Sequence, residues 1–349
     1  MDTVIVEVNP NNVDYDMIKR AGEIIRNGGL VAFPTETVYG LGGEARNRES
    51  SRKIYAAKGR PSDNPLIVHI SKWESLEMIC DDIPPEAQLL ADAFWPGPLT
   101  MIVKKNQVIP KETTGGLDTV AVRMPDHKVA LDFIEAAGGF IAAPSANTSG
   151  KPSPTVAEYV TQDMNGKIEM IIDGGEVGIG VESTIVDLTE GTPTILRPGY
   201  ITEEMLERVL GEVDTDRTIL DNNSGVAPKA PGMKYRHYAP KGDMMLVDGL
   251  PDKVADRINE LVRMAVRSGE KVGVMLTDEI FDKVEAPVKK AVGPRSDEHE
   301  IARRLYRILR EFDDEGVTKI FSESFSDKGF GQAVMNRLLK AAGFNVIKA

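Results

Sequence analysis

The segment "LVAFPTETVYGLGG" spans residues 30–43 and decides how the first half of the chain folds. Its apolar run, residues 30–33, predicts a short buried strand, which Pro34 ends because proline has no amide hydrogen to donate. The turn that follows carries two hydroxyls, Thr35 and Thr37, and glycines at 40, 42 and 43, which allow close approach of the backbone to a ligand. The segment alone fits a binding turn and a threonine-capped structural turn equally well.

Strands and helices alternate on both sides of this segment, which predicts an α/β fold. Several strand connections are too short for crossovers, so we expect a twisted mixed sheet with flanking helices. Further strands are expected at 3–8, 66–70, 99–103, 119–123, 140–143, 168–172, 184–187 and 194–196. Helices are expected at 15–29, 48–59, 126–137, 155–162 and 202–210, with two short ones within 73–94.

The regular pattern fades after residue 210, and a second strand–helix series begins at 244. Its strands are expected at 244–247, 271–275 and 317–321, and its helices at 252–267, 298–312 and 330–341. This order is typical of a small Rossmann-like α/β domain. The predicted division is therefore a catalytic domain over 1–210, a linker over 211–243 and a C-terminal domain over 244–349.

The composition excludes several classes of protein. The 349-residue chain has a net charge of −12, which disfavours broad electrostatic binding of nucleic acid. It has one cysteine, Cys80, so an internal disulfide and a cysteine-based zinc site are excluded. There is no apolar run of transmembrane length, and the first residues lack the basic start of a signal peptide. We therefore expect a cytoplasmic protein.

Familiar catalytic motifs are missing from the sequence. No Walker A sequence, HExxH or GxSxG occurs, and no GxGxxG follows a strand. The four histidines, at 69, 127, 237 and 299, are not spaced as metal ligands, so no protein metal site is expected.

What remains is a set of cations next to predicted strands, namely Lys58, Arg60, Arg123 and Arg197. Lys58 and Arg60 could simply complement the dipole of the preceding helix. However, prolines at 61 and 65 restrict the loop that holds them, and a rigid Lys/Arg pair suits a phosphate. Arg123 lies on a buried strand and needs an anionic partner. The set favours phosphoryl or nucleotidyl transfer, in which positioning and charge neutralisation supply most of the catalysis.

Seven motifs in order, "PTETVYGLG", "KGRP" with "NPL", "WPGPLT", "VAVRMP", "APSAN", "ESTIVD" and "LRPG", resemble the YrdC-like family of threonylcarbamoyl-adenylate synthases. The resemblance begins near residue 14 and reaches 200, while "PGMKYRHYAP" and "GFGQAVMNRLLKAA" are similar to the linker and C-terminal domain of the long form. A YrdC-like catalytic fold is therefore expected.

The resemblance implies a nucleotidyltransferase that joins L-threonine, bicarbonate and ATP into threonylcarbamoyl-AMP and releases pyrophosphate. A separate transferase complex would use the product to make threonylcarbamoyladenosine in tRNA. Mg²⁺ would accompany ATP, held mainly by phosphate oxygens.

The resemblance also assigns roles by motif position. Catalytic positions would be Lys58 and Arg60, with Lys58 on the phosphates. Threonine would be held by Thr37, His69, Arg123, the backbone at Ala143, and Ser183. ATP would be held by Lys58, Arg60, Asn64, Thr119, Ser145, Ser153 and Arg197. From the residues alone, a lone histidine such as His69 on an apolar strand is usually a packed core side chain, and it stays a candidate because its strand leaves the loop of Lys58 and Arg60.

The segment "KYRHY", residues 234–238, is too aromatic and basic for a flexible spacer. It could pack at the seam between the domains. We favour a flap that covers the nucleotide and excludes water, with Tyr235 and Tyr238 contacting ATP.

Two rival functions remain open. A concave basic surface could bind duplex RNA or tRNA directly, although the net charge and the lack of basic runs weigh against it. Another carbamoyl-transferring enzyme is the second rival, but the hydrogenase-maturation type carries zinc fingers that one cysteine cannot build.

Overall fold

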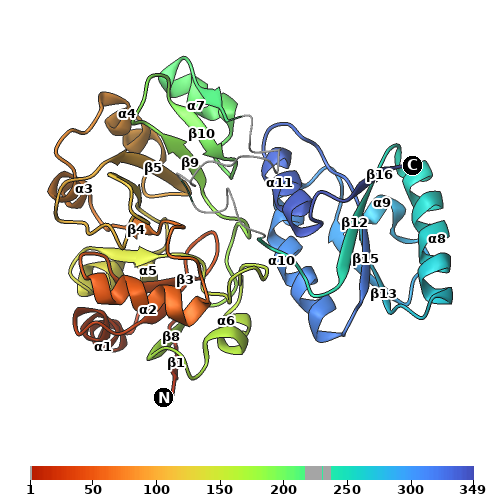
Figure 1. The fold of residues 1–349 in the computed structure, drawn as a ribbon, viewed down its shortest axis with the longest axis horizontal. Helices are drawn as coiled ribbons and strands as arrows, with labels where there is room; N and C mark the ends of the chain where they lie inside the picture. Colours follow the sequence, from red (N-terminus) through yellow and green to blue (C-terminus); the bar gives the residue numbers. More distant parts are fainter. Residues whose placement is uncertain (1, 217–229, 231–236) are drawn as a thin grey trace. The chain divides into compact units, whose positions relative to one another are not determined.

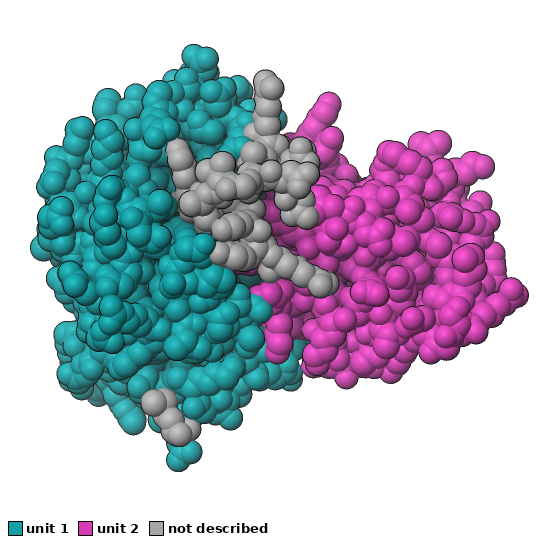
Figure 2. Space-filling view, in the orientation of Figure 1, with its two compact units in different colours: residues 1–149, 153–234 teal, residues 150–152, 235–349 magenta. Residues whose placement is uncertain are grey.

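The computed structural model describes residues 2–216, 230 and 237–349. Two compact units divide the chain, residues 1–149 with 153–234 and residues 150–152 with 235–349 (Figure 2). The expected boundaries of a linker over 211–243 stay a prediction, because most of that range lies outside the described residues.

Within the described part of the first unit, eleven strands form one sheet in the order β1-β8-β2-β3-β7-β4-β6-β5-β9-β10-β11. The strands are β1 (Val4–Glu7), β2 (Val31–Phe33), β3 (Gly40–Glu44), β4 (Ile67–His69), β5 (Leu99–Lys104), β6 (Thr119–Arg123), β7 (Ile141–Ala143), β8 (Met170–Asp173), β9 (Thr184–Asp187), β10 (Thr194–Arg197) and β11 (Asp214–Thr215). β4 runs parallel to β6, whereas β5 runs antiparallel to it. The expectation of a mixed α/β sheet is confirmed.

Seven helices flank this sheet among the described residues: α1 (Tyr15–Arg26), α2 (Arg48–Lys58), α3 (Trp73–Ile79), α4 (Pro85–Phe94), α5 (Lys128–Ala136), α6 (Ala157–Met164) and α7 (Glu203–Leu210). α1 begins where Asp14 accepts hydrogen bonds from two backbone amides, and it ends before Gly28, whose φ is 77°. Its buried residues Ile18 and Ile25 share a core with β2 and α5. This packing fixes the strand that leads into the Thr35–Thr37 turn.

The glycines of the opening segment lie in a strand of the sheet. Residues 40–44 form strand β3 between β2 and β7, where a turn was predicted. A Cβ on Gly42 would lie 2.8 Å from the side chain of Ile141, and one on Gly43 would lie 3.0 Å from Ile54. The sequence left a binding turn and a structural turn equally open, and the packing favours a structural role for Gly42 and Gly43, because neighbouring side chains fill the space above them.

One face of the central strands carries an apolar floor. Alternation along β6 points Val120 and Val122 into the main core and turns Thr119, Ala121 and Arg123 to the other face. On that face the buried side chains of the floor are Ile67, Ile102, Ala121, Ile185, Leu196 and Ala230. Thr119 and Arg123, at the two ends of β6, lie on the same face as this floor.

Among the described residues of the second unit, five parallel strands form a sheet in the order β14-β13-β15-β12-β16. The strands are β12 (Asp243–Asp248), β13 (Val272–Thr277), β14 (Val288–Gly293), β15 (Lys319–Glu323) and β16 (Val346–Lys348), and the helices are α8 (Pro251–Arg267), α9 (Asp278–Phe281), α10 (Glu298–Asp314) and α11 (Gly331–Ala341). Figure 1 shows α8 on one face of this sheet and α10 and α11 on the other. The small α/β fold is as expected, but β15 lies between β13 and β12, so the strand order departs from that of a Rossmann half.

Candidate functional site

Arg123 stands at the centre of the candidate site, at the end of β6, and is 4% exposed. Its Nη1 donates to the Thr37 hydroxyl at 2.9 Å, and its Nε donates to the Gly97 carbonyl at 3.4 Å. Thr37 is itself 2.9 Å from the Thr35 hydroxyl. The turn after β2 and the loop before β5 therefore fix the position of one buried guanidinium.

The anionic partner that Arg123 was expected to need is Glu36, which the sequence reasoning missed. Glu36 Oε2 lies 2.6 Å from Arg123 Nη2, and the two side chains are 13% and 5% exposed. A glutamate between two threonines in an apparent turn gives no signal of such a pairing, because its partner lies on a distant strand.

His69 is the direct neighbour of Arg123 across the β4–β6 pair. Burial and then the nearby Arg123 charge lower the pKa of His69 to about 3, from 6.5. Its ring meets Phe33 edge-on at 5.9 Å, and its Nδ1 is 3.2 Å from the Ile67 carbonyl. His69 is thus neutral near pH 7 and can offer a hydrogen bond without adding a charge.

A second set of contacts leads from Arg123 to Arg197. Thr100 faces Arg123 across the β5–β6 pair, and its hydroxyl is 2.8 Å from that of Ser183. Arg197 donates from Nε to the Ser183 carbonyl at 2.9 Å and from Nη2 to the Ser183 hydroxyl at 3.0 Å. The buried hydroxyls of Thr37, Thr100 and Ser183 therefore lie between or beside two buried guanidinium groups.

Arg60 and Asn64 are joined by hydrogen bonds within one turn. Arg60 Nη2 donates to Asn64 Oδ1 at 2.6 Å and to the Pro65 carbonyl at 3.0 Å. Both residues are buried, at 8% and 1% exposure. This network gives the predicted ATP-binding turn a fixed shape, as its prolines suggested.

Lys58 ends α2 and is 2% exposed. Its ammonium donates to the carbonyls of Ser145 and Asn147, the latter at 2.5 Å. Lys58 therefore anchors the loop after β7, which carries two of the predicted ligand residues.

The remaining predicted positions surround the floor. Thr119 opens β6 and so lies about 13 Å along the strand from Arg123, on the same face. Ala143 ends β7, opposite Ile67 of the floor. Ser153 donates to Glu182 at 2.6 Å, next to Ser183 in the chain. The predicted residues are spread across one face of the sheet and do not all lie at one edge of it. The reason is that β7 runs antiparallel to β4, so the end of β7 lies beside the start of β4.

The predicted flap is described only in part. Tyr235 lies outside the described residues, and Tyr238 belongs to the second unit. There its ring stacks on Tyr306 at 5.3 Å between centroids, and it is 5% exposed. A contact of either tyrosine with ATP stays a prediction.

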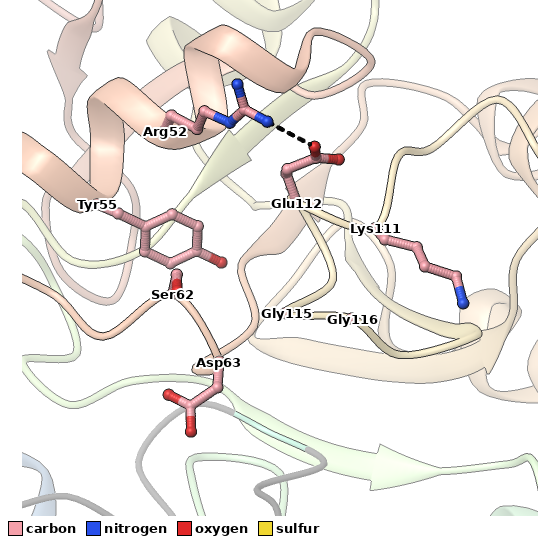
Figure 3. A pocket seen from close by; sticks show the side chains of 8 residues that line it. All are labelled: Arg52, Tyr55, Ser62, Asp63, Lys111, Glu112, Gly115 and Gly116. Atoms are coloured by element: carbon pink, nitrogen blue, oxygen red, sulfur yellow. Dashed lines mark hydrogen bonds and ion pairs between the residues drawn. The ribbon is translucent and has the colours of Figure 1, made fainter.

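One cavity is lined partly by Ser62 and Asp63 of the Arg60–Asn64 turn. Figure 3 shows this cavity, of about 550 Å³, which is lined by Arg52, Tyr55, Ser62, Asp63, Lys111, Glu112, Gly115 and Gly116. A second, of about 480 Å³, shares Lys111 and Glu112 with it. Neither lining includes a predicted substrate residue, so we assign no role to them. Across residues 2–216, 230 and 237–349, no cluster of three metal-ligating side chains occurs and no helix could span a membrane.

Two family models match the chain. The Sua5/YciO/YrdC model, described as "Telomere recombination", matches residues 23–199. The model described as "Threonylcarbamoyl-AMP synthase, C-terminal domain" matches residues 201–343.

Similar proteins extend over the whole length. The threonylcarbamoyl-AMP synthase of Pyrococcus abyssi is 50% identical over 354 residues, covering 99% of each chain, and that of Bacillus subtilis is 48% identical, covering 95% and 94%. The solved structure of P. abyssi Sua5 complexed with L-threonine superposes with a TM-score of 0.95 at 50% identity, covering 99% of this chain and all of the other. Escherichia coli YciO, with a TM-score of 0.52 at 24% identity over 56% of this chain and 95% of its own, shares the fold of the first unit.

Proposed function

This chain belongs to the Sua5/YciO/YrdC family, and from that premise we propose that it synthesises threonylcarbamoyl-AMP from L-threonine, bicarbonate and ATP. The observation that carries the proposal is two buried groups of hydrogen bonds on neighbouring strands. One joins Thr37 to Arg123, the other joins Thr100, Ser183 and Arg197, and Thr100 faces Arg123 across the β5–β6 pair. A cation and hydroxyls at one end of an apolar floor suit an amino acid next to a nucleotide. The full-length relatives that carry this name support the reaction.

In this proposal Arg123 binds the carboxylate of threonine, since a guanidinium matches a carboxylate in charge and shape. The hydroxyls of Thr37 and Ser183 are fixed by the two buried arginines and orient the substrate. Neutral His69 contributes a hydrogen bond and leaves the charge balance of the pocket unchanged.

The reaction is a nucleotidyl transfer. The threonine amine and bicarbonate condense to a carbamate with loss of water, a carbamate oxygen attacks the α-phosphorus of ATP, and pyrophosphate leaves. Phosphate charge would be neutralised by three parts of the site. They are the fixed turn of Arg60 and Asn64, the loop anchored by Lys58, and Arg197. Mg²⁺ bound to the phosphate oxygens would supply further neutralisation, and it fits because ATP itself provides most of its ligands.

The product is a labile mixed anhydride, so it would have to be used at once. It would pass to a transferase complex that modifies tRNA. We place this reaction in the cytoplasm, as the sequence predicts. Direct binding of tRNA has no support from a specific contact in the described residues.

The test is release of pyrophosphate from ATP with threonine and bicarbonate together and with each omitted. We expect turnover only with both, and serine or carbamoyl phosphate should not replace them.

Arg60→Ala should lower turnover at least tenfold, because it breaks the fixed turn. Arg52→Ala, at a side chain 59% exposed on α2, is the matched control. Threonine-independent pyrophosphate release would contradict the proposal.

A further inference from the structure

Glu36 pairs with the guanidinium of Arg123, at the centre of the candidate site. Glu36 lies in the turn between β2 and β3, where its carbonyl accepts the Ile179 amide at 2.9 Å. Its backbone is therefore fixed, and its carboxylate contacts the guanidinium that the proposed function gives to the threonine carboxylate. Two carboxylates at one guanidinium repel each other, so the bound amino acid must change what Glu36 contacts.

The Glu36 carboxylate is short of hydrogen-bond donors. A carboxylate can accept about four hydrogen bonds. Among the described residues neither of its buried oxygens accepts one with good geometry, although Oε2 is 2.6 Å from Arg123. The nearby His127 does not fill this role with Nδ1, which accepts the Ala130 amide at 3.4 Å. A buried carboxylate without donors is costly unless a ligand provides them.

We propose that Glu36 binds the α-ammonium group of the amino acid substrate. The Glu36–Arg123 pair then opens around a zwitterion, with the guanidinium taking the carboxylate and Glu36 taking the ammonium. One buried ion pair is replaced by two, so no charge in the site is left without a counter-charge. This inference rests on the proposed function, because it names a further recognition residue of the same site.

Arg123 can change partners without losing its place. When Glu36 turns away, the Thr37 hydroxyl and the Gly97 carbonyl still hold the guanidinium at two of its nitrogens. Glu36 needs only a side-chain rotation, since Ile179 keeps its backbone in place. The pair therefore selects α-amino acids, because a ligand without the ammonium would leave Glu36 buried and unpaired.

The test compares two ligands in two proteins. L-Threonine and (R)-3-hydroxybutanoate differ only in the amino group. Their affinities for the wild-type full-length protein and for Glu36→Gln are measured by calorimetry and by competition against threonine. We expect Glu36→Gln to weaken threonine binding at least tenfold and to leave 3-hydroxybutanoate unchanged or tighter. The effect of Glu36→Gln on the affinity then depends at least tenfold on whether the ligand carries the ammonium group.

Each other outcome overturns the inference. Equal weakening of both ligands means that Glu36 only orders Arg123, and equal tightening means that it only competes with the carboxylate. If wild-type protein does not bind threonine, the proposed function fails instead. Fluorescence of Trp73 and Trp95, both in the first unit, checks folding. If Glu36→Gln does not fold, Glu36→Asp is tested instead. The ratio of the affinities for L-threonine and 3-hydroxybutanoate should then fall at least threefold relative to wild type. An unchanged ratio overturns the inference.

Discussion

Arg197 holds Ser183 at two atoms, with Nε 2.9 Å from its carbonyl and Nη2 3.0 Å from its hydroxyl. Both residues are buried, and the same hydroxyl is 2.8 Å from Thr100. The planar fork of one guanidinium thus fixes both the backbone and the side chain of Ser183. A lysine at this position keeps the charge but cannot make two divergent contacts.

Arg197→Lys should therefore lower kcat/KM for threonine and for ATP at least tenfold each. A hydrogen bond from a charged donor contributes roughly 1.5–3 kcal/mol, and about 1.4 kcal/mol corresponds to a factor of ten. The measurement is initial-rate pyrophosphate release with one substrate varied at a time. Arg208→Lys, at an exposed position of α7, is the matched control. Wild-type kcat/KM in Arg197→Lys would show that the fork is dispensable.

Thr37→Val should raise the KM for threonine about tenfold or more, because it removes the hydroxyl that accepts from Arg123 Nη1. The change keeps the shape of the side chain and leaves a buried N–H without its acceptor. Thr37→Ser retains the hydroxyl and should stay within about threefold of the wild type, on the same per-bond estimate. Equal effects of the two substitutions would assign the loss to packing.

The elements that the sequence predicted correctly are those with strong periodicity. The apolar residues that recur at helical spacing in α10 are buried, namely Ile301, Leu305, Ile308, Leu309 and Phe312. The strand expected at 119–123 is observed, and its alternation puts Thr119 and Arg123 on one face. The missed strands β14 and β16 lie at the two edges of the small sheet. Edge strands have a solvent-exposed side and tolerate lysine, so residues 288–293, "VKKAVG", lack the apolar pattern of a core strand.

The sequence names candidate site residues, whose roles stay predictions, but it does not give the contacts among them. Motif positions identified Arg123 and Ser183, yet the pairing of Arg123 with Glu36 joins residues 87 positions apart in the chain. Such a pair depends on how the turn after β2 lies across the sheet, which no local pattern specifies. Charge alone required that Arg123 have a partner without indicating which carboxylate it was.

His69 should make the first unit less stable as the pH falls below 6.5. Burial and the Arg123 charge hold its pKa at about 3 in the folded protein. The unfolded chain therefore binds a proton near pH 6.5 that the folded chain refuses, so stability is present above that pH and lost on acidification. Between pH 6.5 and 5 the loss is about 2 kcal/mol, from about 1.4 kcal/mol per pKa unit.

The check is urea unfolding of the wild type and of His69→Gln at pH 7.5 and 5.0. Unfolding is monitored by the fluorescence of the two tryptophans of the first unit. The glutamine variant should lose about 2 kcal/mol less than wild type over this interval, on the same linkage. His127, whose pKa burial also lowers, acts in the same direction in both proteins and cancels in the difference. Parallel losses in the two proteins would mean that His69 is protonated in the folded state.

Gly42→Ala should destabilise the first unit by about 1–3 kcal/mol, the usual cost of forcing an extra carbon into a packed interior. The new Cβ would lie 2.8 Å from Ile141, and the carbonyl of Val31 at 3.2 Å belongs to the paired strand and cannot move without breaking the sheet. Gly178→Ala is the control, because its Cβ would meet nothing nearer than 4.0 Å and its φ is not positive. That change should be neutral or slightly stabilising, through lower entropy of the unfolded chain. Urea unfolding followed by tryptophan fluorescence separates the two. If Gly42→Ala instead kept full stability but lost ATP-dependent turnover, the glycine would serve the ligand after all, as its sequence context first suggested.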